Sequence, residues 1–64
     1  MKTIKNFDEW ENFIDEIKPF CNSIFINNKK IDKRKNINDD MEDIFDNNVI
    51  VSYYIENKNV YIKI

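Results

Sequence analysis

The sequence predicts a single small α+β domain: an N-terminal amphipathic helix packed on an antiparallel sheet of three or four strands, a short second helix and a C-terminal β-hairpin. Three observations predict it. The chain has 64 residues, which is enough for one domain. Apolar residues recur at helical spacing near the N-terminus and alternate with polar residues toward the C-terminus. Five Phe, three Tyr and one Trp supply apolar area for a core.

The first helix is expected from Asn6 to Lys18. Asn6 is the expected N-cap because Glu9 follows it three residues later, as in a capping pair. Pro19 disfavours helical geometry at Lys18, so the helix should end there. One apolar stripe follows the i, i+3, i+4, i+7 pattern and is expected to face the core: Trp10, Phe13, Ile14 and Ile17.

A short strand is expected at Ser23-Ile24-Phe25-Ile26, directly before Asn27-Asn28. The chain contains no Gly, and Asn is then the residue best able to adopt left-handed backbone geometry in a tight turn. Such a turn would pair Ile24 with Ile31 in a hairpin. The alternative is one strand followed by a mobile basic loop from Lys29 to Lys35, and the sequence leaves both open.

The second helix is expected from Asn38 to Asp46. Asn38 is the expected cap, and the acidic residues after it suit the positive end of the helix dipole. Met41, Ile44 and Phe45 share one face, and Asn47-Asn48 should end the helix.

The segment from Val49 to Ile64 is expected to form a hairpin with its turn at Asn57-Lys58. The alternation of apolar residues specifies the register, because a shift by one residue would turn them to the other face. The expected pairs are Ile55 with Val60, Tyr53 with Ile62, and Val51 with Ile64. The other face would carry Tyr54 beside Tyr61, and Ser52 beside Lys63, either exposed or covered by the second helix.

Missing residue types exclude most catalytic chemistry. The chain has no His and one Cys, so the usual general base, the usual metal ligand and a disulfide are lacking. Without Gly it has no Gly-rich phosphate loop, and Asp39-Asp40 with Asp43 lacks the spacing of a calcium loop. We therefore expect no enzyme activity, no cofactor and no metal. Cys21 is expected to be a small buried residue.

The same features predict a cytoplasmic protein without a membrane partner. No stretch reaches the roughly 18–20 apolar residues that span a bilayer, and a single Cys requires no oxidising compartment. Residues with AT-rich codons dominate, which indicates a low-GC genome or one of its phages or plasmids. For a phage-encoded protein the expected location is the host cytosol.

Charges occur in blocks although the formal net charge is only −2. Both helices are acidic, and Lys18 is the only cation across them. A basic run separates them, consisting of Lys29, Lys30, Lys33, Arg34 and Lys35. Such blocks create local potentials that attract charged partners even when the total charge nearly cancels.

We therefore expect a non-catalytic inhibitor that binds a nucleic-acid-handling protein, of the anti-CRISPR or other anti-defence type encoded by phages and mobile elements. Carboxylates along a surface can occupy a groove built for phosphates. The expected partner-binding residues are Asp8, Glu11, Asp15, Asp39, Asp40, Glu42, Asp43 and Asp46, with Tyr54 and Tyr61 as anchors.

Two alternatives stay open. One is an antitoxin or regulatory subunit that binds a cognate partner, with a homodimer formed through an exposed sheet edge. The other is a weak nucleic-acid-binding module that uses Lys29, Lys30, Lys33, Arg34 and Lys35, with the two tyrosines stacking on bases. A sequence pI near 5.0 argues against nucleic acid as the partner.

Overall fold

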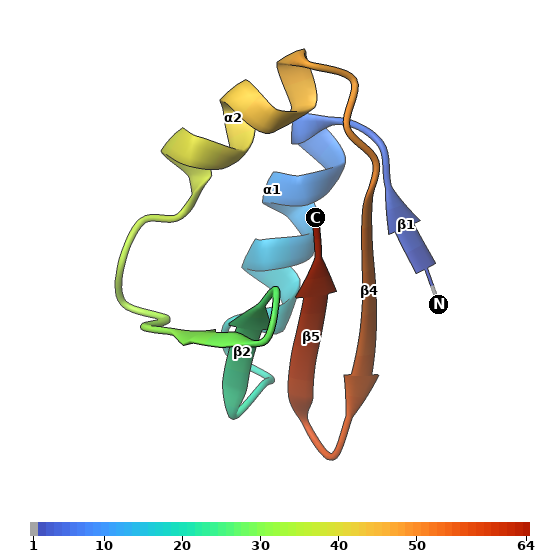
Figure 1. Cartoon of the computed structure of the whole chain (residues 1–64). Coiled ribbons are helices and arrows are strands. Elements are labelled where there is room, and N and C mark those ends of the chain that lie inside the picture. The colour runs from blue at the N-terminus through green and yellow to red at the C-terminus, as the bar shows by residue number, and fades with distance from the viewer. Residues whose placement is uncertain (1) are drawn as a thin grey trace.

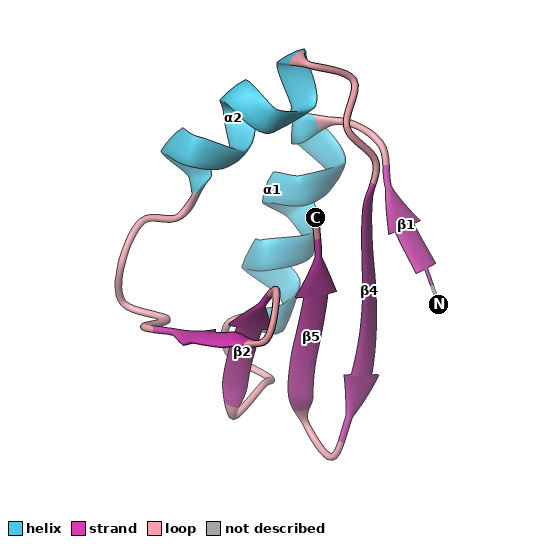
Figure 2. Ribbon diagram, viewed as in Figure 1, coloured by secondary structure: helices cyan, strands magenta, loops and turns pink. Residues whose placement is uncertain are grey.

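A five-stranded sheet forms the centre of the molecule, with α1 against one of its faces and α2 across the N-terminal end of α1 (Figure 1). The computed structural model describes residues 2–64. Figure 2 shows the same view by secondary structure. The elements are β1 (Lys2–Ile4), α1 (Phe7–Ile17), β2 (Ser23–Ile26), β3 (Lys29–Ile31), α2 (Asn38–Asp46), β4 (Val51–Glu56) and β5 (Asn59–Lys63). The α+β class and the single helix–sheet core are as predicted.

The sheet differs from the prediction in two ways. It has five strands in the order β1-β4-β5-β2-β3, not three or four. The additional edge strand, β1, has only three residues, of which Ile4 alone is buried, so it shows no alternation over a useful length. The sheet is also mixed, because β2 runs parallel to β5 while the other neighbouring strands are antiparallel. That pairing joins segments far apart in the sequence, so no local sequence pattern predicts it.

Helix α1 forms as the sequence predicts. The Asn6 side chain accepts a hydrogen bond from the Glu9 amide at 2.9 Å, and the Glu9 carboxylate accepts one from the Lys5 amide at 3.1 Å. The first bond satisfies an amide that the first turn of a helix would otherwise leave unpaired, and the second attaches the residue before the N-cap to the helix. Trp10, Ile14 and Ile17 are buried against the sheet, and the helix ends before Pro19.

The segment after β2 forms a hairpin. The first alternative is therefore confirmed, and the alternative of a single strand followed by a basic loop from Lys29 to Lys35 is wrong. Ile24 pairs with Ile31 across β2 and β3. Asn27 and Asn28 form the turn with φ of 49° and 68°, in the left-handed region that Asn tolerates better than most residues. The Asn27 side chain also accepts a hydrogen bond from the Ile64 amide at 3.0 Å, which attaches the turn to the end of β5.

Helix α2 has the predicted bounds but not the predicted cap. Ile37 occupies the N-cap position and makes no side-chain capping bond. The Asn38 side chain instead accepts a hydrogen bond from the indole N–H of Trp10 at 2.9 Å. A buried indole N–H requires an acceptor, and this long-range bond takes the place of a local cap. Met41 and Phe45 are buried, and Asn48 ends the helix with φ of 60°.

The C-terminal hairpin has the predicted turn and register. Ile55 pairs with Val60, Tyr53 with Ile62, and Tyr54 with Tyr61. The predicted pairing of Val51 with Ile64 is wrong: Ile64 lies beyond the last residue of β5, and Val51 pairs with Ile4 of β1. Tyr53 faces the core as expected, with its ring centroid 4.2 Å from that of Phe13.

Candidate functional site

Three aromatic rings form a row on the sheet face opposite α1. The register places Phe25 of β2 directly beside Tyr61 of β5, and Tyr61 directly beside Tyr54 of β4. Ring centroids are 5.1 Å apart for Phe25 and Tyr61, with planes inclined by 8°. They are 4.8 Å apart for Tyr61 and Tyr54, with planes inclined by 14°. We call Phe25, Tyr61 and Tyr54 the aromatic row.

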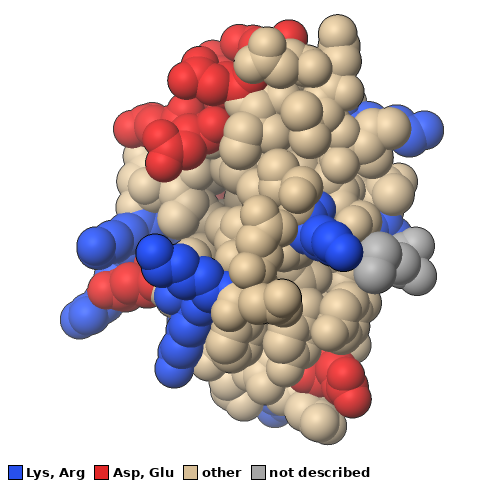
Figure 3. Space-filling model, viewed as in Figure 1, with Lys and Arg blue, Asp and Glu red and all other residues tan. Residues whose placement is uncertain are grey.

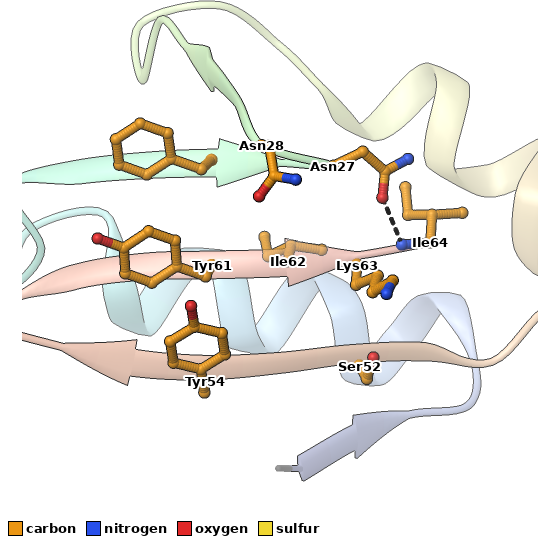
Figure 4. A pocket seen from close by; sticks show the side chains of 9 residues that line it. Asn27, Asn28, Ser52, Tyr54, Tyr61, Ile62, Lys63 and Ile64 are labelled. Atoms are coloured by element: carbon orange, nitrogen blue, oxygen red, sulfur yellow. Dashed lines mark hydrogen bonds between the residues drawn. The ribbon is translucent and has the colours of Figure 1, made fainter.

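Neither helix covers the aromatic row. Tyr54 is 44% exposed, and Phe25 and Tyr61 are half-buried by their neighbours. In Figure 4 the rings of Tyr61 and Tyr54 face the viewer, α1 lies behind the strands, and no helix lies in front of the rings. The expected position of these tyrosines on the outer face is therefore confirmed, and the alternative that α2 covers them is wrong.

A groove of about 500 Å³ lies over the row. Its remaining lining is mostly polar and comes from the β2–β3 turn and the far end of the hairpin: Asn27, Asn28, Ser52, Ile62, Lys63 and Ile64 (Figure 4). The groove thus has an aromatic floor and a rim of amide, hydroxyl and ammonium groups.

The acidic residues of both helices are exposed. Figure 3 shows acidic side chains gathered over α2, with a group of Lys and Arg side chains below them in this view. Within residues 2–64, the only ion pair joins Arg34 to Asp32, so no helix carboxylate is neutralised by a neighbouring cation. The exposed set includes every acid predicted to bind a partner: Asp8, Glu11, Asp15, Asp39, Asp40, Glu42, Asp43 and Asp46.

The basic segment does not form one continuous patch. The Lys33 ammonium donates to the backbone carbonyls of Lys18 and Cys21, at the C-terminal end of α1. Arg34 is paired with Asp32, and hydrogen bonds from the Arg34 side chain and backbone lower the pKa of the Asp32 carboxyl. The same side-chain hydrogen bond raises the pKa of Arg34. Two of the five predicted cations therefore have intramolecular roles.

The lysines of β3 lie on opposite faces of the sheet. Lys30 pairs with Phe25 and so shares the face of the aromatic row. Lys29 pairs with Ile26 and lies on the face toward α1. Lys35 is exposed in the loop before α2. Of the two lysines of β3, Lys30 is therefore the one that lies beside the row.

Sequence reasoning missed Phe25 and Lys63 as parts of this site. Phe25 joins the tyrosines only through the parallel pairing of β2 with β5, which no local pattern predicts. Lys63 was placed beside Ser52 on the correct face, and the structure adds its position on the rim of the groove. One signal in the sequence could have placed Phe25. Neighbouring residues of a strand point to opposite faces, so Phe25 lies on the face away from the core if Ile24 faces the core.

Other candidate features are accounted for within the fold. Trp10 is fully buried in the core, and Cys21 is buried with a free thiol, as predicted. Among residues 2–64, no three His, Cys, Asp or Glu side chains lie close enough together to hold a metal ion. Neither described helix has the length and apolar character needed to cross a bilayer.

Comparison with protein-family models, with curated proteins and with solved structures gave no match to this chain.

Proposed function

We propose that this protein is a non-catalytic inhibitor that binds a nucleic-acid-handling protein through its acidic helices. In biological terms this is an anti-defence protein, of the anti-CRISPR or a related type, encoded by a phage or another mobile element and acting in the host cytosol. The observation that carries the proposal is the exposure of the helix carboxylates, which have no ion-pair partner among residues 2–64.

Helix α2 has a charge density close to that of a nucleic acid. Its five acids occur between Asp39 and Asp46, which is about 10 Å of helix axis at roughly 1.5 Å per residue. That is about one negative charge per 2 Å, against about one per 1.7 Å in duplex DNA. A protein groove whose Lys and Arg side chains bind phosphates would therefore accept α2 with similar electrostatic complementarity.

The absence of ion pairs from the helix carboxylates, within the part of the chain that the structure describes, also supports the proposal. A carboxylate already paired within the protein would have to exchange one cation for another on binding, with little net gain. Unpaired and solvated carboxylates attract a basic partner over distances of about a Debye length, roughly 8 Å at physiological ionic strength. They thereby raise the association rate as well as specificity.

The first experiment reverses three charges on α2. Protein carrying Asp39→Lys, Asp40→Lys and Asp43→Lys is compared with wild type in affinity capture from a low-GC bacterial lysate, followed by mass spectrometry. We expect wild type to retain a nucleic-acid-handling protein and the variant to bind it at least about tenfold more weakly. The matched control reverses Glu16 and Glu56, which are exposed acids outside the assigned set, and should retain the partner.

Two results would contradict this proposal. One is full partner binding by the α2 variant with an unchanged circular-dichroism spectrum. The other is a wild-type capture that contains no nucleic-acid-handling protein.

The same surface would also serve an antitoxin or regulatory subunit with one cognate partner. The observation that favours this second candidate is the short edge strand β3, which has a neighbour on one side only in the described chain and could pair with a second copy. Light scattering distinguishes a dimer from a monomer. A strictly monomeric protein would exclude the dimer of this second candidate. The identity of the captured protein then separates a toxin from a defence enzyme.

A further inference from the structure

We infer that the outer face of the sheet binds a short segment of single-stranded nucleic acid, with bases stacked on the ends of the aromatic row and phosphates held by Lys30 and Lys63. This inference uses a different face from the acidic helices and does not depend on the proposed function. It also differs from binding by the whole basic segment, because only Lys30 of that segment takes part.

The two ends of the aromatic row provide the stacking surfaces. Three nearly parallel rings lie across three adjacent strands, with centroids 5.1 and 4.8 Å apart. Rings at this spacing stack on one another, so Phe25 and Tyr54 cover the two faces of Tyr61, and a base can stack on the ring faces that Phe25 and Tyr54 turn away from Tyr61. Nucleobases stack on exposed aromatic rings with a favourable free energy that depends little on base identity. Because neighbouring rings already hold Tyr61 in place, the row is ordered before a ligand binds, which lowers the entropic cost of binding.

The charges around the row suit a phosphodiester backbone. Lys30 lies directly across from Phe25 at one end of the row, and Lys63 lies two residues along β5 from Tyr61. Both ammonium groups are exposed, and neither makes an ion pair within residues 2–64. Glu56, near the turn of the β4–β5 hairpin, is the acid on this face. The face is thus locally positive although the whole chain carries a net charge of −2.

The rim of the groove supplies groups that match base edges. The Ser52 hydroxyl and the Asn28 amide line the groove and can each donate and accept hydrogen bonds. The Asn27 amide oxygen is occupied by the Ile64 amide, so Asn27 fixes the rim in place. An apolar protein segment would leave the ammonium, hydroxyl and amide groups without partners, and this favours nucleic acid as the occupant.

The acidic helices limit where a polyanion can bind. They repel phosphates from the face that α1 covers and from α2, so a strand is directed to the sheet face. The same repulsion keeps the affinity modest and makes it strongly dependent on salt. For single strands, the logarithm of the affinity falls by about 0.7 per phosphate contact for each tenfold rise in salt.

The test measures binding of a fluorescein-labelled oligothymidylate of eight nucleotides by anisotropy at low salt, with purified protein alone. Tyr54→Ala is expected to weaken binding about tenfold, whereas Tyr54→Phe, which keeps the ring, should bind like wild type. Lys30→Gln and Lys63→Gln should each weaken binding and each reduce the salt slope by about 0.7.

Lys29→Gln is the matched control for Lys30→Gln. The two lysines are neighbours on β3, both exposed, but they lie on opposite faces of the sheet. Lys29→Gln and Lys35→Gln are expected to leave both the affinity and the salt slope at wild-type values, apart from a small general charge effect. Amide spectra of labelled protein verify that every variant is folded and locate the oligonucleotide, with shifts expected at residues 25, 54, 61 and 63.

Three results would overturn the inference. The first is no binding of the oligonucleotide up to about 1 mM protein at low salt. The second is an equal loss of oligonucleotide affinity in Lys29→Gln, Lys30→Gln and Lys35→Gln, which would assign binding to the basic segment. The third is a concentration-dependent dimer that Tyr54→Ala dissociates, without oligonucleotide binding, which would make the row a contact between copies of this chain.

Discussion

At the scale of single residues, the bond between Trp10 and Asn38 connects the two helices. The indole is fully buried, and its N–H has the Asn38 oxygen as its acceptor at 2.9 Å. Ring centroids of Trp10 and Phe45 lie 6.2 Å apart, so the same side chain also packs against the far end of α2. One residue thus fixes the position of α2 by a polar contact and by an apolar one.

We predict that Asn38→Ala destabilises the fold by about 1–3 kcal/mol, because it leaves a buried indole N–H without an acceptor. Urea unfolding monitored by the fluorescence of Trp10 measures this loss. Asn12→Ala is the control, since Asn12 is exposed on α1, and it should change stability by less than about 0.5 kcal/mol. Equal midpoints for the two variants would show that the bond contributes nothing.

At the scale of elements, both hairpins turn without glycine. Asn57 and Lys58 have φ of 53° and 63°, and Asn27 and Asn28 are in the same left-handed region. Two successive left-handed residues match the right-handed twist of paired strands. Asn tolerates this geometry because of its short polar side chain, whereas the Cβ atom of Lys is sterically strained there.

We predict that Lys58→Gly stabilises the protein by about 0.5–1 kcal/mol, because relief of the steric cost at Lys58 exceeds the added entropy of the unfolded chain. The urea midpoint should rise while the slope stays constant. The same substitution within a strand, Lys30→Gly, should lower stability by a similar amount. A lower midpoint for Lys58→Gly would contradict the argument.

Sequence patterns predicted the elements that depend on local order. The stripe from Trp10 to Ile17, the acidic second helix and the alternation around Asn57-Lys58 are properties of single segments, and each formed as predicted. The failures are non-local. The edge strand β1, the parallel pairing of β2 with β5, and the Asn38 acceptor all depend on residues distant in the chain. For the same reason, the pair of tyrosines was predictable and the third ring of the row was not.

At the scale of the whole molecule, two surfaces of different character share one small core. The helices carry carboxylates that make no ion pair with any described residue, and the opposite sheet face carries aromatic rings with a few lysines. Within α2, like charges face one another at i, i+3 and i+4, for example Asp39 with Asp43, and each such pair destabilises a helix by about 0.2–0.5 kcal/mol. The acidic surface therefore lowers the stability of the fold.

We predict that sodium chloride stabilises the protein by about 1 kcal/mol between low and molar concentrations, because it screens these repulsions. Thermal unfolding followed by circular dichroism measures the effect. In Asp43→Lys, the interactions of residue 43 with the neighbouring acids become attractive. This variant should therefore be more stable than wild type at low salt, and its stability should respond less to added salt. A wild-type melting temperature that is independent of salt would refute this account of the acidic surface.

The place of β5 in the sheet has a consequence for folding. This strand follows all the others in the chain, yet it lies between β4 and β2 and joins the two halves of the sheet. Without β5, the β1–β4 pair and the β2–β3 hairpin have no strand between them that joins them into one sheet. The five-stranded sheet therefore forms only when β5 pairs with β4 and β2 together.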